Sequence, residues 1–428
     1  MMKYLQGLAT AISIFSLSSG TSGAPAFDGE GTANASIISV PYQYTYLLPE
    51  PFTGNVNYTF VNGTRTPQNK TVDSLLQTAA KTPIISYSNE FHSIFGSNPE
   101  VKLIQNRTAE NDTFAYEAGV WVPERNEIWF ASAVSQAQIH PGTVYSFNLD
   151  TGHVGALNST PKVMNPDGGY YFQGKVYFAS YGGPKNSTYR GGVISVDVKT
   201  LQVETVTNSY FGLPYNGIDD IVWATNPKNN SEKYMFFTDL EYFEMAWGKN
   251  TPAPQLPNSI YRWDPQEEIV RPVVTRNDLN PNGIRVSPDM KTLYIPDSAD
   301  IYGPFPTGPG AESWLGPYIY AYKLDEDMLP SSRTVFGQVR QGLADGIHVD
   351  DKGRVWTAES EGVVCRNKKG KVIGVVNSEY FKTDKTAAAL PIANFALAEN
   401  TLVVLAGKTL WTVKTDEVLV ARNSSIVN

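Results

Sequence analysis

The sequence of 428 residues predicts an all-β protein, a six-bladed β-propeller with an N-terminal extension. A hairpin pattern recurs six times between residue 114 and the C-terminus. Each copy has a polar head residue, a short apolar strand, a turn and a second apolar strand. The head residues follow one another at intervals of 50, 52, 63, 63 and 49 residues, a period typical of propeller blades. No long segment has the 3.6-residue apolar periodicity of an amphipathic helix.

The residues within each hairpin support its prediction. The turns mostly contain Asp, Asn or Gly, which tight connections favour, and apolar residues alternate along strands, as in Ile347 and Val349. Further strand candidates between the hairpins, such as TVYSFNLDTG and YIYAYKLDE, would complete four strands per blade. The six hairpins occupy residues 114–133, 167–180, 219–239, 282–298, 345–360 and 394–411.

The residues before the first hairpin are predicted to form two parts. Residues 1–24 have a short positive start, an apolar run too short to span a bilayer comfortably, and small residues suited to cleavage. These features predict a secretory signal peptide, with a membrane anchor as the alternative. Residues 25–113 are predicted to be an extension that packs on the ring or supplies its closing strand. Residues 114–428 are predicted to form the propeller.

Composition argues against nucleic-acid binding, and the glycosylation sequons support export from the cell. The net charge is −8 and no basic run exists, which argues against nucleic-acid binding. Cys365 is the only cysteine, so no intrachain disulfide can form. We expect a secreted glycoprotein with no membrane association after signal removal; the oligomeric state is left open. Glycosylation sequons begin at Asn34, Asn57, Asn62, Asn69, Asn106, Asn111, Asn158, Asn186, Asn229 and Asn423.

The head residues are the candidates for chemistry. In a propeller the first strand of each blade lines the central channel, so residues at the start of these strands converge around the axis. Carboxylates brought together in this way repel one another, unless one is protonated or a cation binds between them. Oxygen donors suit a hard ion, with Ca²⁺ expected first and Zn²⁺, Mg²⁺ or Mn²⁺ as alternatives. The predicted metal ligands are Glu117, Asp219, Asn282 and Asp345, out of six heads that also include Asp167 and Asn394.

Two alternatives accompany these assignments. Asp-Gly and Asn-Gly pairs often mark turns, so single heads such as Asp345 could be turn residues. Long loops leave the second strands on the side of the heads, and their aromatic residues could form an apolar wall or simply pack within the loops. The predicted substrate contacts are Asn216, Trp247, Tyr302 and Trp314. His348 alternates with apolar neighbours, so we expect it to face an adjacent blade without a catalytic role.

Several motifs taken in order resemble the SMP-30/gluconolactonase/LRE-like family, and within it the secreted fungal lactonohydrolases of the gluconolactonase and D-pantolactone hydrolase type. They include YEAGVWVPERNEIWF, NPDGGYYFQGKVYFAS, LNPNGIRVSPDMKTLYIPDS and ADGIHVDDKGRVW. The resemblance implies a six-bladed propeller with a divalent ion held by Glu117, Asn282 and Asp345. It also implies that Asp345 acts as a base. The family usually has Asn where this chain has Asp219, which adds negative charge to the site.

The resemblance therefore implies hydrolysis of a small lactone, with Asp345 or Asp219 removing a proton from water. No G-x-S-x-G, H-E-x-x-H, P-loop or strand-linked G-x-G-x-x-G motif suggests other chemistry. Two alternatives remain. One is a non-catalytic secreted propeller that binds a sugar or a protein partner around a structural calcium. The other is an enzyme similar to strictosidine synthase.

Overall fold

The computed structural model describes residues 33–34, 37–110, 113–134, 142–241, 246–275, 279–298, 317–382 and 391–421. The predicted signal peptide, the predicted substrate contacts Tyr302 and Trp314, and the sequons at Asn111 and Asn423 lie outside these ranges. Within them, no helix combines the length and the apolar character needed to cross a membrane.

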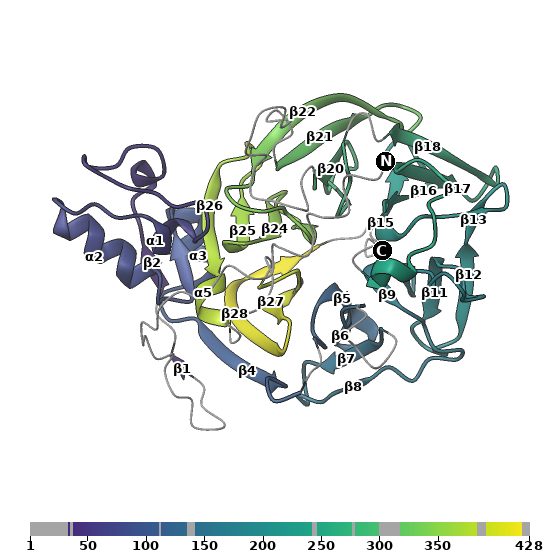
Figure 1. The fold of residues 1–428 in the computed structure, drawn as a ribbon, viewed down its shortest axis with the longest axis horizontal. Coiled ribbons are helices and arrows are strands. Elements are labelled where there is room, and N and C mark those ends of the chain that lie inside the picture. The colour runs from purple at the N-terminus through teal and green to yellow at the C-terminus, as the bar shows by residue number, and fades with distance from the viewer. Residues whose placement is uncertain are drawn as a thin grey trace. The chain divides into compact units, whose positions relative to one another are not determined.

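The first three blades are four-stranded antiparallel sheets, which Figure 1 shows around a ring. Blade 1 contains β5 (Glu117–Val122), β6 (Glu127–Ala131), β7 (Val144–Asn148) and β8 (Val154–Ala156). Blade 2 contains β9 (Pro166–Phe172), β10 (Lys175–Ser180), β11 (Gly192–Asp197) and β12 (Val203–Thr207). Blade 3 contains β15 (Ile218–Asn226), β16 (Asn229–Asp239), β17 (Ser259–Asp264) and β18 (Ile269–Thr275). A small hairpin, β13 (Ser209–Tyr210) and β14 (Leu213–Pro214), connects blades 2 and 3.

The remaining blades include strands from the N-terminal region. Blade 4 contains β19 (Arg285–Val286), β20 (Thr292–Pro296), β21 (Tyr318–Leu324) and β22 (Pro330–Gln338). Blade 5 contains β23 (Ile347–Val349), β24 (Val355–Glu359), β25 (Gly362–Arg366) and β26 (Val372–Asn377), extended by β3 (Ile84–Ser86) and β2 (Ile37–Ser39). Blade 6 contains β27 (Asn394–Ala406), β28 (Thr409–Val420), β4 (Glu100–Asn106) and β1 (Ala33–Asn34). The sequence prediction of six blades is therefore confirmed.

The ring closes through contacts between its innermost strands and through one shared blade. The innermost strands contact one another in the order β5, β9, β15, β19, β23 and β27, and β27 contacts β5 again. In blade 6, β4 pairs antiparallel with β28, with Leu103 opposite Trp411. Strands from the two ends of the described chain thus form one sheet, which holds the ring closed without a disulfide.

Short helices cover the outer side of blade 5, beside β26 in Figure 1. Asn69 caps the longest of them, because its side chain accepts a hydrogen bond from the Val72 backbone N–H at 3.1 Å. Only three residues on one face of this helix are buried, so its apolar stripe was too short to recognise in the sequence. The helices are α1 (Phe60–Gly63), α2 (Lys70–Ala79), α3 (Asn89–Phe95) and α5 (Ser378–Phe381), with 3₁₀ turns η1 (Tyr42–Thr45), η2 (Pro123–Arg125) and η3 (Gly248–Asn250).

Large apolar side chains fill the space between neighbouring blades. Trp223 of β15 stacks on Phe172 of β9, with ring centroids 4.7 Å apart and an angle of 4° between the ring planes. His348 of β23 packs edge-on against Phe395 of β27 at 4.8 Å, so it faces an adjacent blade as predicted. Such contacts hold the inner strands, and the heads that they carry, in fixed positions.

Candidate active site

Local irregularities turn the head side chains toward the channel. In blade 1 the pairing of β5 with β6 shifts between Glu117 and Val120, where Ala118 and Gly119 have φ angles of 70° and 66°. In blade 3 the register of β15 shifts between Ile218 and Ile221. Bulges of this kind redirect a side chain at the end of a strand. They explain why a carboxylate can stand where an otherwise apolar strand begins.

The glycines that follow three heads allow adjacent blades to approach closely. A Cβ atom on Gly168 would lie 2.4 Å from the Asp219 carbonyl oxygen, and one on Gly283 would lie 2.6 Å from the Asp345 carbonyl oxygen. A Cβ atom on Gly346 would lie 2.4 Å from the side-chain amide carbon of Asn394. These Asp-Gly and Asn-Gly pairs are therefore not signs of turns. They bring one head against the next around the channel.

The heads interact directly with one another. The Asn394 side-chain amide donates a hydrogen bond to Glu117 Oε2 at 3.0 Å. The Asn282 side chain hydrogen-bonds Asp345, and its Nδ2 also donates to Ser298 Oγ at 3.1 Å. The carboxyl groups of Asp167 and Asp219 share a hydrogen bond. The structure thus brings the predicted metal ligands Glu117, Asp219, Asn282 and Asp345 into one buried cluster, together with Asp167 and Asn394.

The cluster accumulates negative charge. Burial, followed by the charges of Asp345 and Asp167, raises the pKa of Glu117 well above its usual range. Burial and then Asp167 likewise raise the pKa values of Asp219 and Asp345. Burial raises the pKa of Asp167 to about 7, although its hydrogen bonds with Tyr181 and Asp219 act in the opposite direction. Removing these protons at neutral pH therefore requires a compensating positive charge.

That charge is not supplied by side chains of the described residues. Among them, no Lys, Arg or His forms a salt bridge with Glu117, Asp167, Asp219 or Asp345. Hard oxygen donors that lack a countercharge are the ligand type that Ca²⁺ prefers. In the described part of the chain, however, no three carboxylate, imidazole or thiol groups are gathered into a ready-made metal site. The chemistry of the donors nevertheless fits a divalent cation, which would draw these oxygen atoms together.

Two tyrosines at the cluster were missed by the sequence analysis. Tyr116 is half-buried, and burial followed by the charge of Asp345 raises the pKa of its hydroxyl. Glu117, Asp167 and Asp219 raise it further, so this hydroxyl lies near all four carboxyl groups. Tyr181, at the end of β10, hydrogen-bonds Asp167. The position of Tyr116, immediately before a head residue, was the available signal for its placement.

Two predicted substrate contacts lie within the described residues. Asn216 is buried; its Nδ2 donates to the Leu256 carbonyl at 2.6 Å, and its Oδ1 accepts from the Gln255 N–H at 3.2 Å. It therefore holds the loop before β17. Trp247 packs with Tyr181 and donates its indole N–H to the Gly182 carbonyl at 3.2 Å. Contact of either residue with substrate stays a prediction.

The predicted glycosylation sites are mostly accessible where the structure describes them. Five of these asparagines are exposed and two, Asn62 and Asn69, are partly exposed. Asn69 uses its oxygen to cap α2, which leaves its amide nitrogen available. Glycosylation itself stays a prediction. The exposed asparagines are Asn57, Asn106, Asn158, Asn186 and Asn229.

A propeller with an acidic and amide-rich cluster where its inner strands begin defines the class of protein. The chain matches the family described as SMP-30/Gluconolactonase/LRE-like region over residues 117–390, and it belongs to that family. The resemblance inferred from the sequence motifs is thus confirmed. The match begins at Glu117 and includes every head residue except Asn394, which lies just beyond its end.

Individual relatives agree with this assignment. Two lactonohydrolases of Aspergillus oryzae are 28% identical over 67% of this chain and 26% identical over 76% of it. The alignments span 65% and 81% of those two proteins, respectively. The fold is similar to that of a solved gluconolactonase from Xanthomonas campestris, with a TM-score of 0.59, 19% identity, and coverage of 78% of this chain and 95% of the other. The predicted enzyme class, a lactonase, agrees with the names of all three.

Proposed function

We propose that this protein is a secreted, divalent-cation-dependent lactonase that hydrolyses a small sugar- or pantolactone-like lactone to its hydroxy acid. The observation that carries the proposal is the buried cluster of Glu117, Asp219, Asn282 and Asp345, whose negative charge has no basic partner among the described residues. The lactonohydrolase and gluconolactonase relatives support the substrate class. Ca²⁺ is the expected cation, since all four side chains offer oxygen donors.

The residues of the cluster would have different roles in the hydrolysis. A bound divalent cation would supply Lewis-acid polarisation of the lactone carbonyl and charge stabilisation in the transition state. Asp345 would accept a proton from the attacking water as the water oxygen bonds to the carbonyl carbon. The ring C–O bond would then break, and the proton would pass from Asp345 to the departing ring oxygen. Asn282 would orient the Asp345 carboxylate through their hydrogen bond.

Asp345 suits the role of base better than Asp219. The carboxyl group of Asp219 shares a hydrogen bond with Asp167, which ties up one of its oxygens. Burial raises the pKa of both carboxyl groups, so both accept a proton more readily than an exposed carboxylate would. The hydrogen-bond partner distinguishes them, because Asp345 is held by the neutral amide of Asn282 and Asp219 by a second carboxyl group. The Tyr116 hydroxyl, whose pKa is raised by the same four carboxyl groups, would donate a hydrogen bond to a substrate oxygen.

A lactone panel tests the proposal. Purified, deglycosylated protein would be given γ- and δ-lactones in a pH-stat, with Ca²⁺ and with a chelator. We expect acid release from at least one lactone that stops on chelation and resumes when Ca²⁺ is restored. Absence of cation-dependent acid release across the panel would contradict the proposal and favour a propeller that only binds its ligand.

A further inference from the structure

Arg285 is a buried residue three positions after the head Asn282, and it connects three blades. It is 3% exposed. Its Nη1 pairs with Asp220 Oδ2 at 2.6 Å and donates to the Ile221 carbonyl at 3.1 Å, both in blade 3. Its Nη2 donates to the Gly169 carbonyl of blade 2 at 3.1 Å. One guanidinium group thus fixes β9 and β15 to the start of its own strand, β19.

The groups that Arg285 holds are neighbours of the heads. Gly169 lies two residues after Asp167, and Asp220 directly follows Asp219. Asp220 Oδ2 also accepts a hydrogen bond from the Ile284 N–H at 3.0 Å, two residues after Asn282. A displacement of this guanidinium would therefore be transmitted to three heads through one or two peptide units each.

We propose that Arg285 is a positioning residue for the site: by bonding Asp220 and the Gly169 carbonyl, it holds Asp167, Asp219 and Asn282 in the register that cation binding requires. The inference rests on the proposed function, because it assigns Arg285 a task in that same site. Losing a partner that orients ligands typically costs about 10- to 100-fold in affinity or activity.

A cavity lies beside Arg285, through which a guanidinium ion could replace the side chain in a variant that lacks it. Arg285, His348 and Gly169 line it, and it reaches the partly exposed residues Trp121 and Pro123. The Nε atom of Arg285 is buried and has no hydrogen-bond partner within the described residues. A small guanidinium ion could therefore enter and occupy the space left by an Arg285→Ala substitution.

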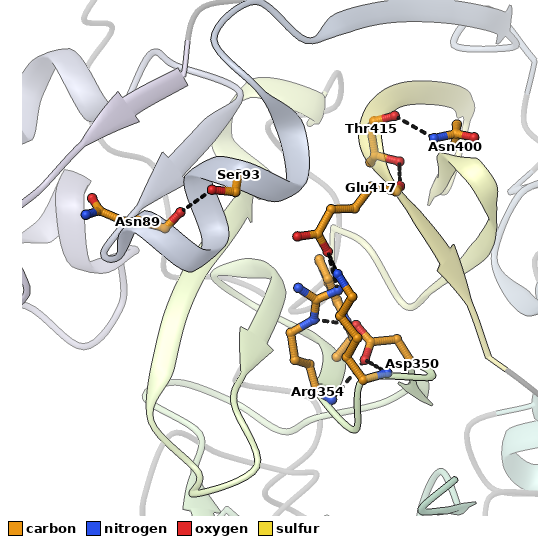
Figure 2. A network of polar contacts seen from close by, with 9 residues as sticks. Asn89, Ser93, Asp350, Arg354, Asn400, Thr415 and Glu417 are labelled. Atoms are coloured by element: carbon orange, nitrogen blue, oxygen red, sulfur yellow. Dashed lines mark hydrogen bonds and ion pairs between the residues drawn. The ribbon is translucent and has the colours of Figure 1, made fainter.

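A second buried arginine provides a matched control. Arg354 is 2% exposed and pairs through Nε with Asp350 Oδ2 at 2.6 Å (Figure 2). It lies between β23 and β24 of blade 5, beyond the end of β23 that is opposite to Asp345. Its Nη2 also bonds Glu417 Oε2 of blade 6 at 3.0 Å. Each arginine thus forms a buried ion pair and also bonds a neighbouring blade, and only Arg285 does so next to the heads.

The experiment measures Ca²⁺ affinity by calorimetry, together with kcat and KM, on folded protein. We expect Arg285→Met to weaken Ca²⁺ binding and lower kcat by about tenfold or more, while Arg354→Met changes neither by more than about twofold even though it is less stable. Loss of a positive charge alone would tighten cation binding. Weaker binding therefore identifies positioning, and unchanged or tighter binding would overturn the inference.

Two further variants keep the test decisive. The double variant Asp220→Asn/Arg285→Met leaves the net charge of the site unchanged and leaves no carboxylate at position 220 without its arginine, so it should fold. We expect the same loss of Ca²⁺ affinity. Arg285→Ala should recover affinity and kcat in millimolar guanidinium, whereas Arg354→Ala should not respond. Failure of the proposed function would already be seen in the unaltered protein, as absent Ca²⁺ binding or lactone opening. Failure of this inference alone would be seen only in the variants.

Discussion

Two buried clusters of charge in this propeller handle their carboxylates in opposite ways. In the cluster of Figure 2, the Asp350 side chain receives hydrogen bonds from Arg354 Nε and from the Trp356 indole at 2.6 and 3.0 Å, and Arg354 also reaches Glu417. At the heads, by contrast, Glu117 and Asp345 are surrounded by other carboxyl groups, and burial and these neighbours raise their pKa values. The Asp350 cluster is neutralised by an arginine of the chain, whereas the carboxyl groups at the heads require a positive charge from outside the chain.

This difference separates a cluster with a structural role from one with a functional role. A buried ion pair with its hydrogen bonds satisfied fixes the local geometry of the chain and carries no chemistry. A buried acidic cluster without a countercharge is costly, and such costs concentrate at functional sites. The repeat places a polar head in every blade, and the carboxyl heads of blades 1, 2, 3 and 5 build up this unbalanced charge, whereas the heads of blades 4 and 6 are neutral amides.

The sharpest contrast is expected between Asp345→Asn and Asp350→Asn. The first should lower kcat by about 100-fold or more, because it removes the proposed base while keeping a similar shape. The second should leave kcat of the folded protein within about twofold and should destabilise it by about 3 kcal/mol, because Arg354 loses the carboxylate of its fully buried ion pair and keeps only the partly exposed Glu417. Steady-state kinetics and urea unfolding measure the two effects. Full activity in Asp345→Asn would remove this residue from the mechanism.

Cation binding should stabilise the head cluster and leave the other cluster unaffected. At a free Ca²⁺ concentration of 100 times the dissociation constant, we expect the free energy of unfolding to rise by about 2.7 kcal/mol. The same gain should persist in Arg354→Met, measured by urea unfolding with Ca²⁺ and with a chelator. A gain that vanishes in Arg354→Met but persists in Asp345→Asn would reverse our assignment of the two clusters.

A smaller effect is expected in how the free energy of unfolding depends on pH. The pKa of Asp167 is raised by burial to about 7, so the folded protein holds a proton that the unfolded chain has already released. The contribution of Asp167 to stability should therefore fall as pH rises toward 7. From pH 5 to pH 8 in chelator, this residue should account for a loss of about 2 kcal/mol. His348, whose pKa is lowered to about 3, acts in the opposite direction below its ordinary value.

The variant Asp167→Asn isolates this effect, because His348 is the same in both proteins. The loss of stability between pH 5 and pH 8 should be smaller in the variant than in the unaltered protein. Added Ca²⁺ should also reduce the loss in the unaltered protein. Identical pH profiles for the two proteins in chelator would show that the pKa of Asp167 is not raised in the folded protein.

Much of the fold could be predicted because the repeat is local. A head, two strands and a turn lie within about 20 consecutive residues, so alternation and turn residues reveal them in the sequence. The pairing of β4 with β28 joins residues near 103 and 411, and no local pattern reports a contact across such a separation. Helix α2 was missed for a different reason, since its buried face has only Val72, Leu76 and Ala79.

The candidate site was only partly predictable. A common register identified Glu117, Asn282 and Asp345, because equivalent positions in a ring must converge. The same register contained Asp167, but nothing in the sequence indicated that it would share a hydrogen bond with Asp219. The link from Arg285 to Asp220 depends on which way each side chain turns after a bulge, and the repeat pattern does not encode that direction.

The most direct test of the account is an anomalous diffraction experiment on crystals grown with Mn²⁺ or Ca²⁺. The account predicts one strong peak at the head of the channel, within roughly 2.0–2.6 Å of oxygen atoms from Glu117, Asn282 and Asp345. It would be contradicted if a cation saturating the protein in solution gave no peak there, or if the peak lay elsewhere while these three side chains kept their present contacts.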